Sequence, residues 1–159
     1  MSTAESAFDP TYDLVVERVV RASPGTAWAA WTQPEHLRRW YAPEPGFISE
    51  CEIDLRPGGV FRFVPCQPDG TENPITCCYL DVVPYERLVW TDALRGGFRP
   101  APRAFFTAVM TLERVADATR CRTLAMHPSQ ADRDAHDRAG FHQGWGTVLD
   151  QLAGYVRTI

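Results

Sequence analysis

The segment from Ser129 to Ile159 constrains the fold most, because its pattern predicts one amphipathic helix at the end of the chain. Ser129 and Asp132 have the spacing of a capping box, and acidic side chains favour a helix N-terminus. Seven apolar residues then recur at spacings of three and four: Phe141, Trp145, Val148, Leu149, Leu152, Tyr155 and Val156. They occupy an arc of about 120° on a helix. Such a helix is not stable alone in water, so the remaining chain must provide an apolar surface for it.

Alternating apolar and polar residues predict that this surface is a β-sheet. The period of two is typical of strands with one buried face, and short polar connections between strands predict hairpins in an antiparallel sheet. The expected strands are residues 12–20, 49–55, 60–64, 75–83, 88–91, 105–115 and 119–127. If the charged residues mark the exposed side, ten residues form the covered face: Phe61, Phe63, Cys78, Leu80, Leu88, Trp90, Phe106, Met110, Cys121 and Thr123.

Two short helices are expected between the first and second strands. Ser23 and Pro24 predict a helix start, since Pro is favoured in the first turn. Thr32 and Glu35 predict a second capping box, and the second helix should end at Trp40. The chain is therefore expected to form one α+β domain over residues 12–159, after a flexible segment at 1–11.

Composition excludes several classes of function. A net charge of −4 and a pI near 5.5 argue against a nucleic-acid-binding surface. The sequence contains no run of 18 apolar residues that would predict a membrane span, and the N-terminus lacks the pattern of a signal peptide, so we expect a cytoplasmic protein.

The five cysteines are odd in number and lack C-x-x-C spacing, which predicts reduced thiols and no metal site. No motif for a cofactor or for covalent catalysis is present, so we expect no cofactor.

Four sequence phrases carry a resemblance to a known family. They are AWAAWTQPE at 27–35, LRPGG at 55–59, DVVPYERLVWT at 81–91 and AGFHQGW at 139–145. In this order they resemble the START-like (SRPBCC, Bet v-like) superfamily, and within it the activator of heat-shock-protein-90 ATPase homologue family. The resemblance implies a helix-grip fold, in which a curved antiparallel seven-stranded sheet wraps around a long C-terminal helix. Family members often carry Gly where this chain has Cys77, which affects the expected geometry of that strand.

The resemblance leaves several functions open, because the superfamily contains lipid carriers, hormone receptors, aromatase/cyclase domains, oxygenase subunits and co-chaperone domains. Members with a single domain resemble binders of small apolar molecules. We therefore expect non-catalytic binding of a small hydrophobic or aromatic molecule between sheet and helix. The alternatives are a cyclase/aromatase-like enzyme that uses the same cavity, and a co-chaperone-like interaction domain. We expect no stimulation of the chaperone, and a homodimer is compatible with the sequence but has no direct signal in it.

The expected ligand cavity is lined by large apolar side chains, although the same residues could simply fill the core. They are Trp40, Phe61, Phe63, Trp90, Phe106, Phe141, Trp145 and Leu149. Arg18, Arg138 and His142 are the candidates for a polar wall or rim of this cavity. Of the four histidines, His142 is favoured because it neighbours Phe141 and Trp145, whereas His36 and His136 are expected on exposed faces and His127 at a strand end. The Gly- and Pro-rich loop at 94–103 is expected to gate the cavity or to be a plain connection.

Overall fold

Seven antiparallel strands form one strongly curved sheet in the computed structural model, which describes residues 8–159. The strands are β1 (Asp13–Val20), β2 (Phe47–Ile53), β3 (Val60–Cys66), β4 (Ile75–Val83), β5 (Arg87–Thr91), β8 (Thr107–Val115) and β9 (Ala118–Met126). Their order across the sheet is β1-β9-β8-β5-β4-β3-β2, so each hairpin expected from the sequence is present. Residues 1–7 of the predicted flexible segment lie outside the described range, and residues 9–12 form a hydrogen-bonded turn before β1.

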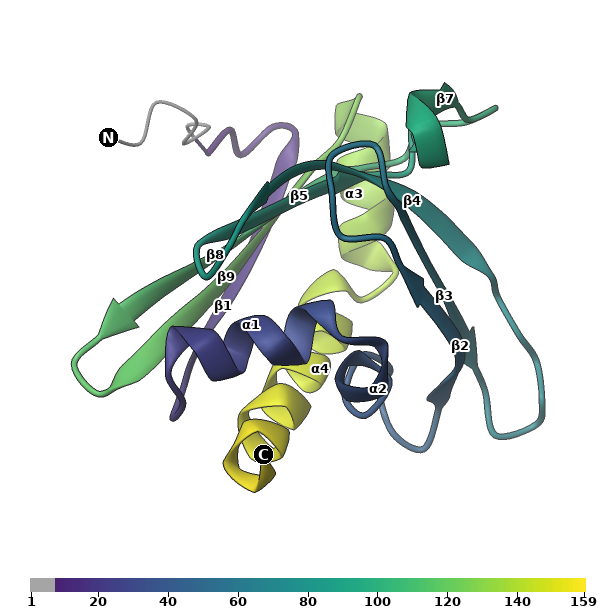
Figure 1. Cartoon of the computed structure of the whole chain (residues 1–159). Coiled ribbons are helices and arrows are strands. Elements are labelled where there is room, and N and C mark those ends of the chain that lie inside the picture. The colour runs from purple at the N-terminus through teal and green to yellow at the C-terminus, as the bar shows by residue number, and fades with distance from the viewer. Residues whose placement is uncertain (1–7) are drawn as a thin grey trace.

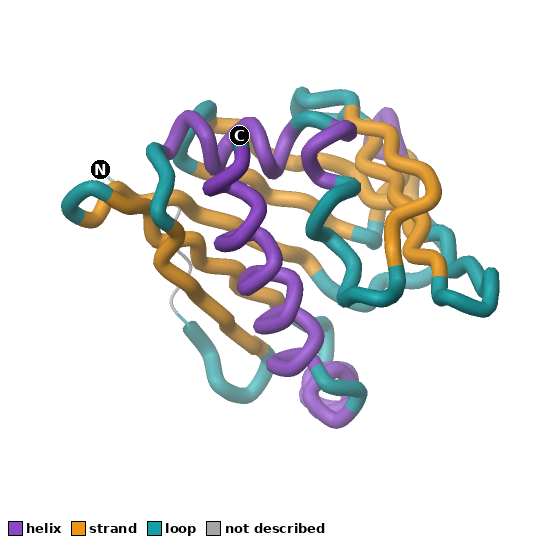
Figure 2. The backbone as a smooth tube through the Cα atoms, turned by 90° about the horizontal axis from the view of Figure 1, so that it is seen from below, coloured by secondary structure: helices purple, strands orange, loops and turns teal. Residues whose placement is uncertain are grey.

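Helices fill the concave side of this sheet. Two short helices, α1 (Pro24–Thr32) and α2 (Pro34–Leu37), carry the chain from β1 at one edge to β2 at the other. The C-terminal helix α4 (Phe141–Tyr155), followed by the 3-10 turn η2 (Val156–Thr158), lies beneath the arch of strands (Figures 1 and 2). The predicted α+β helix-grip fold is confirmed. No helix among the described residues is long and apolar enough to cross a membrane.

The apolar stripe of α4 holds the helix against the sheet. Its residues Phe141, Val148, Leu149 and Leu152 are buried in the core, and Val156 continues the stripe into η2. Burying side chains of this size stabilises a fold by about 1.5–3 kcal/mol each before the entropy cost is subtracted. The helix lies mainly against β1, at the edge of the sheet.

The predicted single helix from Ser129 is wrong at its start, because two helices occupy this segment. Ser129 caps α3 (Gln130–Arg138) by accepting a hydrogen bond from the backbone N–H of Asp132 at 3.1 Å, as predicted. Gly140 then adopts a left-handed conformation (φ 98°), which ends one helix and lets α4 begin in a different direction (Figures 1 and 2). The faces of α3 therefore do not continue those of α4.

The capping box predicted at Thr32 is wrong, unlike the cap predicted at Ser129. The Thr32 hydroxyl donates to the Trp28 carbonyl inside α1, and Gln33 is the N-cap of α2 without a side-chain hydrogen bond. His36, expected on an exposed face, is partly buried, and its Nδ1 lies 2.7 Å from the Tyr155 hydroxyl. This contact joins α2 to the end of α4.

The predicted inward face of β4 is wrong by one residue. Cys77 and Tyr79 belong to the core, whereas Cys78 and Leu80 face the opposite side of the sheet. Both faces of this strand are apolar, so alternation could not decide between them. A bulge between Tyr79 and Asp81 shifts the register further along the strand.

The loop expected to gate the cavity covers the outer face of the sheet instead. It forms a small hairpin of β6 (Leu94–Arg95) and β7 (Arg99–Pro100) around the 3-10 turn η1 (Gly96–Phe98). Both β6 and η1 pack against β4, and Gly96 lies against Val60. This cover explains why Cys78 is fully buried although it points away from the helices.

Candidate functional site

A pocket of about 360 Å³ lies between the N-terminal half of α4 and the curved sheet, and it opens to solvent. Its volume is within the range of small-molecule sites. The lining residues are mostly apolar: Tyr41, Pro43, Phe63, Ile75, Phe106, His136, Ala139, Gly140, Phe141, Gly144, Trp145 and Val148.

One face of α4 provides the helical wall. Phe141, Trp145 and Val148 recur at helical spacing, and Gly144 lies among them. Trp145 is only partly buried, and a Cβ atom added at Gly144 would meet no heavy atom within 4 Å. The pocket is therefore open where the helix backbone at Gly144 carries no side chain.

The opposite wall combines two strands with the segment that follows α2. Phe63 comes from β3 and Ile75 from the start of β4, while Tyr41 packs edge-on against both Phe63 and Trp145 at ring distances of 5.0 and 5.7 Å. Gln151 of α4 holds this segment: its Nε2 donates to the carbonyl oxygens of Trp40 and Ala42, at 3.0 and 2.8 Å. The sequence predicted neither Tyr41 nor the clamp by Gln151.

The eight predicted cavity residues divide into two groups. Phe63, Phe106, Phe141 and Trp145 lie in the pocket wall. The other four, Trp40, Phe61, Trp90 and Leu149, have exposed fractions of 1% or less and fill the closed core. The pocket lies nearer the start of α4 than the sequence predicted, because the later turns of the helix pack closely against the sheet.

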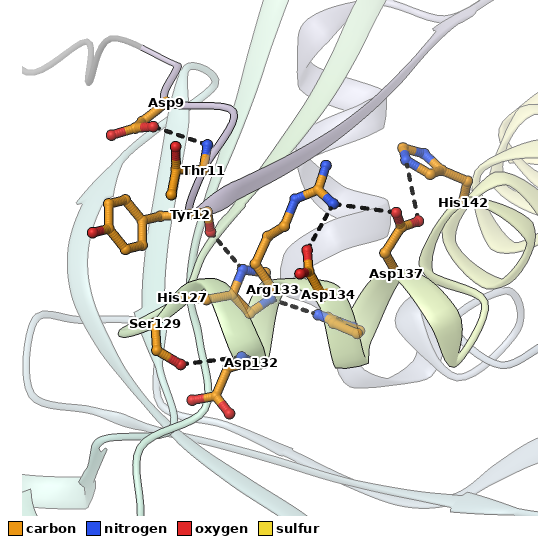
Figure 3. Close-up of polar contacts among 11 residues, drawn as sticks. Asp9, Thr11, Tyr12, His127, Ser129, Asp132, Arg133, Asp134, Asp137 and His142 are labelled. Atoms are coloured by element: carbon orange, nitrogen blue, oxygen red, sulfur yellow. Dashed lines mark hydrogen bonds and ion pairs between the residues drawn. The ribbon is translucent and has the colours of Figure 1, made fainter.

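Arg18, Arg138 and His142 do not line the pocket. Arg18 is on β1 beneath α4, where its guanidinium Nε pairs with Asp150 at 2.9 Å and its end contacts Gly146. Arg138 is exposed at the end of α3. His142 is exposed, with Nε2 4.0 Å from the Asp137 carboxylate (Figure 3).

The histidine in the pocket wall is His136, which the sequence placed on a polar helix face. Its ring packs against Phe105 and Phe141, each with a centroid distance of 5.0 Å. Burial, with a contribution from nearby His127, lowers the pKa of His136 from 6.5 to about 4, against the opposing effect of Asp137. The signal that could have revealed His136 was Gly140, since a helix break there changes which face of α3 meets the core.

His127, which contacts His136, belongs to a polar cluster at the junction of β9 and α3; His127 and its neighbours Arg133, Asp134 and Asp137 are drawn in Figure 3. Nδ1 of His136 lies 2.8 Å from Nε2 of His127, whose Nδ1 lies 2.8 Å from the carbonyl oxygen of Tyr12. Beside them, Arg133 bridges Asp134 and Asp137 at 3.2 and 3.3 Å. Within residues 8–159, no three His, Cys, Asp or Glu side chains are arranged to hold a metal ion.

The thiols are not activated for chemistry. All five cysteines are free, and burial raises the pKa of Cys51 to about 11 and of Cys77 and Cys121 to about 12. A thiol with a raised pKa carries little thiolate at neutral pH and is a poor nucleophile. The site therefore offers shape, apolar surface, one imidazole, one tyrosine hydroxyl and one indole N–H.

A curled sheet around a C-terminal helix defines the helix-grip class of single-domain proteins, and in this chain an apolar pocket lies beside the N-terminal half of that helix. The family model described as Activator of Hsp90 ATPase homolog 1-like protein matches residues 21–157, and the chain belongs to this family. No curated protein sequence matches the chain.

Solved structures show the same fold over nearly the whole chain. A protein of Nitrosomonas europaea is 38% identical and superposes with a TM-score of 0.92, covering 95% of this chain and 97% of that one. A protein of Rhodobacter sphaeroides, 20% identical, has a TM-score of 0.82 with the same coverage. An AHSA1-like protein of Aeromonas hydrophila, 19% identical, has a TM-score of 0.71 and 92% coverage of both chains. At these last two identities the similarity shows the fold alone.

Proposed function

We propose that the protein binds a small apolar or aromatic molecule in this pocket without transforming it. The observation that carries the proposal is the open pocket of about 360 Å³, whose wall is formed mainly by aromatic and aliphatic side chains. A fully packed core would leave no such space, and an exposed apolar hollow of this kind is typical of ligand sites. The family to which the chain belongs has hydrophobic ligand-binding cavities, which agrees with this proposal.

A thermal-shift screen with fatty acids, flavonoids and aromatic polyketides provides the first test. A ligand that binds only the folded protein raises the melting temperature as its concentration increases. We expect aromatic molecules of two or three fused rings to give the largest shifts, because Phe63, Phe141 and Trp145 offer ring faces and edges.

Two glycine variants of α4 then place the ligand in the pocket. Gly144→Leu adds a side chain that projects into the pocket, and Gly154→Leu adds the same side chain at an exposed position with nothing within 4 Å. We expect Gly144→Leu to weaken binding at least tenfold and Gly154→Leu to leave it unchanged, with both proteins folded. Equal binding by the two variants contradicts the proposed site.

A second candidate function is a cyclase-type enzyme that orients a reactive substrate in the same pocket. His136 favours it, because a general acid or base must reach the substrate from the wall. With a pKa of about 4, however, His136 is a weak base at neutral pH, and we therefore place binding first. Turnover of a polyketide by the native protein that is lost in a binding-competent His136→Asn variant supports the enzyme.

We also propose that the protein is cytoplasmic and that it acts without the heat-shock chaperone. An ATPase assay of the chaperone, with and without the purified protein, tests the second part. We expect no stimulation, and a reproducible increase in ATPase rate favours the co-chaperone alternative.

A further inference from the structure

Three residues of the pocket wall carry polar side-chain atoms, Tyr41, Trp145 and His136, and the indole nitrogen of Trp145 can only donate. The Tyr41 hydroxyl can both donate and accept a hydrogen bond, and burial raises its pKa well above the ordinary value, so it stays protonated. The Tyr41 hydroxyl therefore accommodates a ligand group that donates a hydrogen bond as well as one that accepts it. His136 is different, because its contacts outside the pocket decide which ring nitrogen carries the proton.

The proton positions follow from the carbonyl oxygen of Tyr12. A carbonyl oxygen can only accept, and it lies 2.8 Å from Nδ1 and 3.0 Å from the backbone nitrogen of His127 (Figure 3). Nδ1 of His127 must therefore carry a proton. When the His127 imidazole is neutral, its other nitrogen, Nε2, is an acceptor.

The acceptor on His127 fixes the tautomer of His136 in turn. Nε2 of His127 lies 2.8 Å from Nδ1 of His136, so Nδ1 of His136 must donate. Nε2 of His136 is left as an unprotonated nitrogen, and among residues 8–159 no donor forms a hydrogen bond with it. His136, whose side chain lines the pocket, thus carries an acceptor nitrogen without a hydrogen-bond partner among the described residues.

The charges around His136 keep the ring neutral at pH 7. Burial and the neighbouring His127 of β9 disfavour its charged form, and the Asp137 carboxylate of α3 favours it. Asp137 is itself shared with Arg133, at 3.3 Å, and faces His142 at 4.0 Å. Because of these contacts, the Asp137 carboxylate stabilises the charged form of the His136 imidazole less.

We propose that His136 determines ligand specificity: Nε2, held as an acceptor through Tyr12 and His127, selects aromatic molecules that carry a hydroxyl group over molecules of the same shape without a hydrogen-bond donor. This inference rests on the proposed binding at this pocket. An ionised carboxylate cannot donate to Nε2 of His136, so it gains nothing from this acceptor. The class of ligand is therefore phenolic.

The test compares 2-naphthol with 2-methoxynaphthalene by isothermal titration calorimetry at pH 7.5. The two probes share a ring system, and only the first can donate a hydrogen bond. One net hydrogen bond corresponds to a preference of about threefold to tenfold for 2-naphthol. The matched variant is His136→Asn, whose amide can still donate to His127 but places no acceptor where Nε2 lies. Comparing the ratio of affinities in the two proteins cancels the different hydration of the probes.

We expect the ratio to fall by about threefold to tenfold in His136→Asn. If both probes bind and the ratio is the same in both proteins, the specificity role of His136 is wrong while ligand binding stands. If the native protein binds neither probe, the phenol-binding inference fails, and a negative thermal-shift screen shows whether the proposed function fails with it.

A second measurement does not depend on the variant or on any ligand. A long-range proton–nitrogen NMR spectrum of the native protein distinguishes protonated from unprotonated ring nitrogens. We expect His136 with a protonated Nδ1 and an unprotonated Nε2, and His127 with the same tautomer. A protonated Nε2 on His136 at pH 7.5 overturns the inference.

Discussion

At the residue scale, the concave face contains polar atoms that the fold does not satisfy. The hydroxyl of Tyr79 and the indole nitrogens of Trp31 and Trp90 are buried without a hydrogen-bond partner among residues 8–159. Tyr79 is fully buried and stacks on Phe61 at a centroid distance of 5.2 Å. The aromatic rings stabilise the core through their area, while these polar atoms reduce its stability.

Tyr79→Phe should therefore stabilise the protein. An unpaired buried hydroxyl costs about 1–3 kcal/mol, so its removal should raise the free energy of unfolding by about 1 kcal/mol. Tyr155→Phe is the matched control, because its hydroxyl is bonded to His36 at 2.7 Å and its loss should destabilise by about 1 kcal/mol. Urea unfolding measures both. A Tyr79→Phe protein less stable than the native one would show that this hydroxyl has a partner.

His136 should make stability depend on pH between about 6.5 and 4. Its pKa is lower in the folded protein than in the unfolded chain, so the unfolded chain binds more protons in this window. Stability is therefore complete above pH 6.5 and falls as the pH decreases toward 4. Because the side chain is only partly buried, we expect a loss of about 1–2 kcal/mol.

The comparison with His136→Asn isolates this effect from the carboxylates and the other histidines. Unfolding free energies measured by urea at several pH values should converge or cross as the pH decreases, since the variant lacks this titration. Parallel curves for the two proteins would contradict the lowered pKa.

At the element scale, the junction between α3 and α4 decides where the pocket is. Gly140 ends α3 in a left-handed conformation and itself lines the pocket, and α4 then starts with the wall residue Phe141. A residue with a Cβ atom is strained in this conformation. The direction of α3, and with it the position of His136, depends on this one residue.

Gly140→Ala should destabilise the protein by about 1–2 kcal/mol. Gly154→Ala should instead stabilise it by about 1 kcal/mol, because Gly154 lies inside α4 with open space around it. Thermal unfolding of the two variants measures the contrast. Similar melting temperatures would mean that the left-handed junction is not required.

The sequence predicted the elements well and their details less well. Alternation located the strands of the sheet, and the stripe from Phe141 to Val156 located the gripped helix. Alternation could not orient β4, because Cys77 and Cys78 are both buried on opposite faces. Periodicity carried through Gly140 placed His136 on the wrong face, because a helical pattern does not report a change of direction.

At the scale of the whole molecule, the curvature of the sheet separates a closed core from an open pocket. Trp40, Phe61 and Trp90 are large and apolar like Phe63 and Trp145, so composition could not tell core from wall. The difference depends on how far α4 lies from each strand, which no local pattern encodes. The segment after α2, held by Gln151, completes the pocket through Tyr41 and Pro43, whereas the sequence predicted their neighbour Trp40.

An NMR titration of the isotope-labelled protein with 2-naphthol shows whether this pocket holds an aromatic ligand. We expect saturable shifts of backbone signals that are confined to residues around the pocket, in segments 41–43 and 139–148 and at Phe63 and Ile75. Signals of the exposed β6–β7 hairpin should not move. Saturable shifts centred on that hairpin, with the pocket signals unchanged, would show that the aromatic ligand does not bind in this pocket.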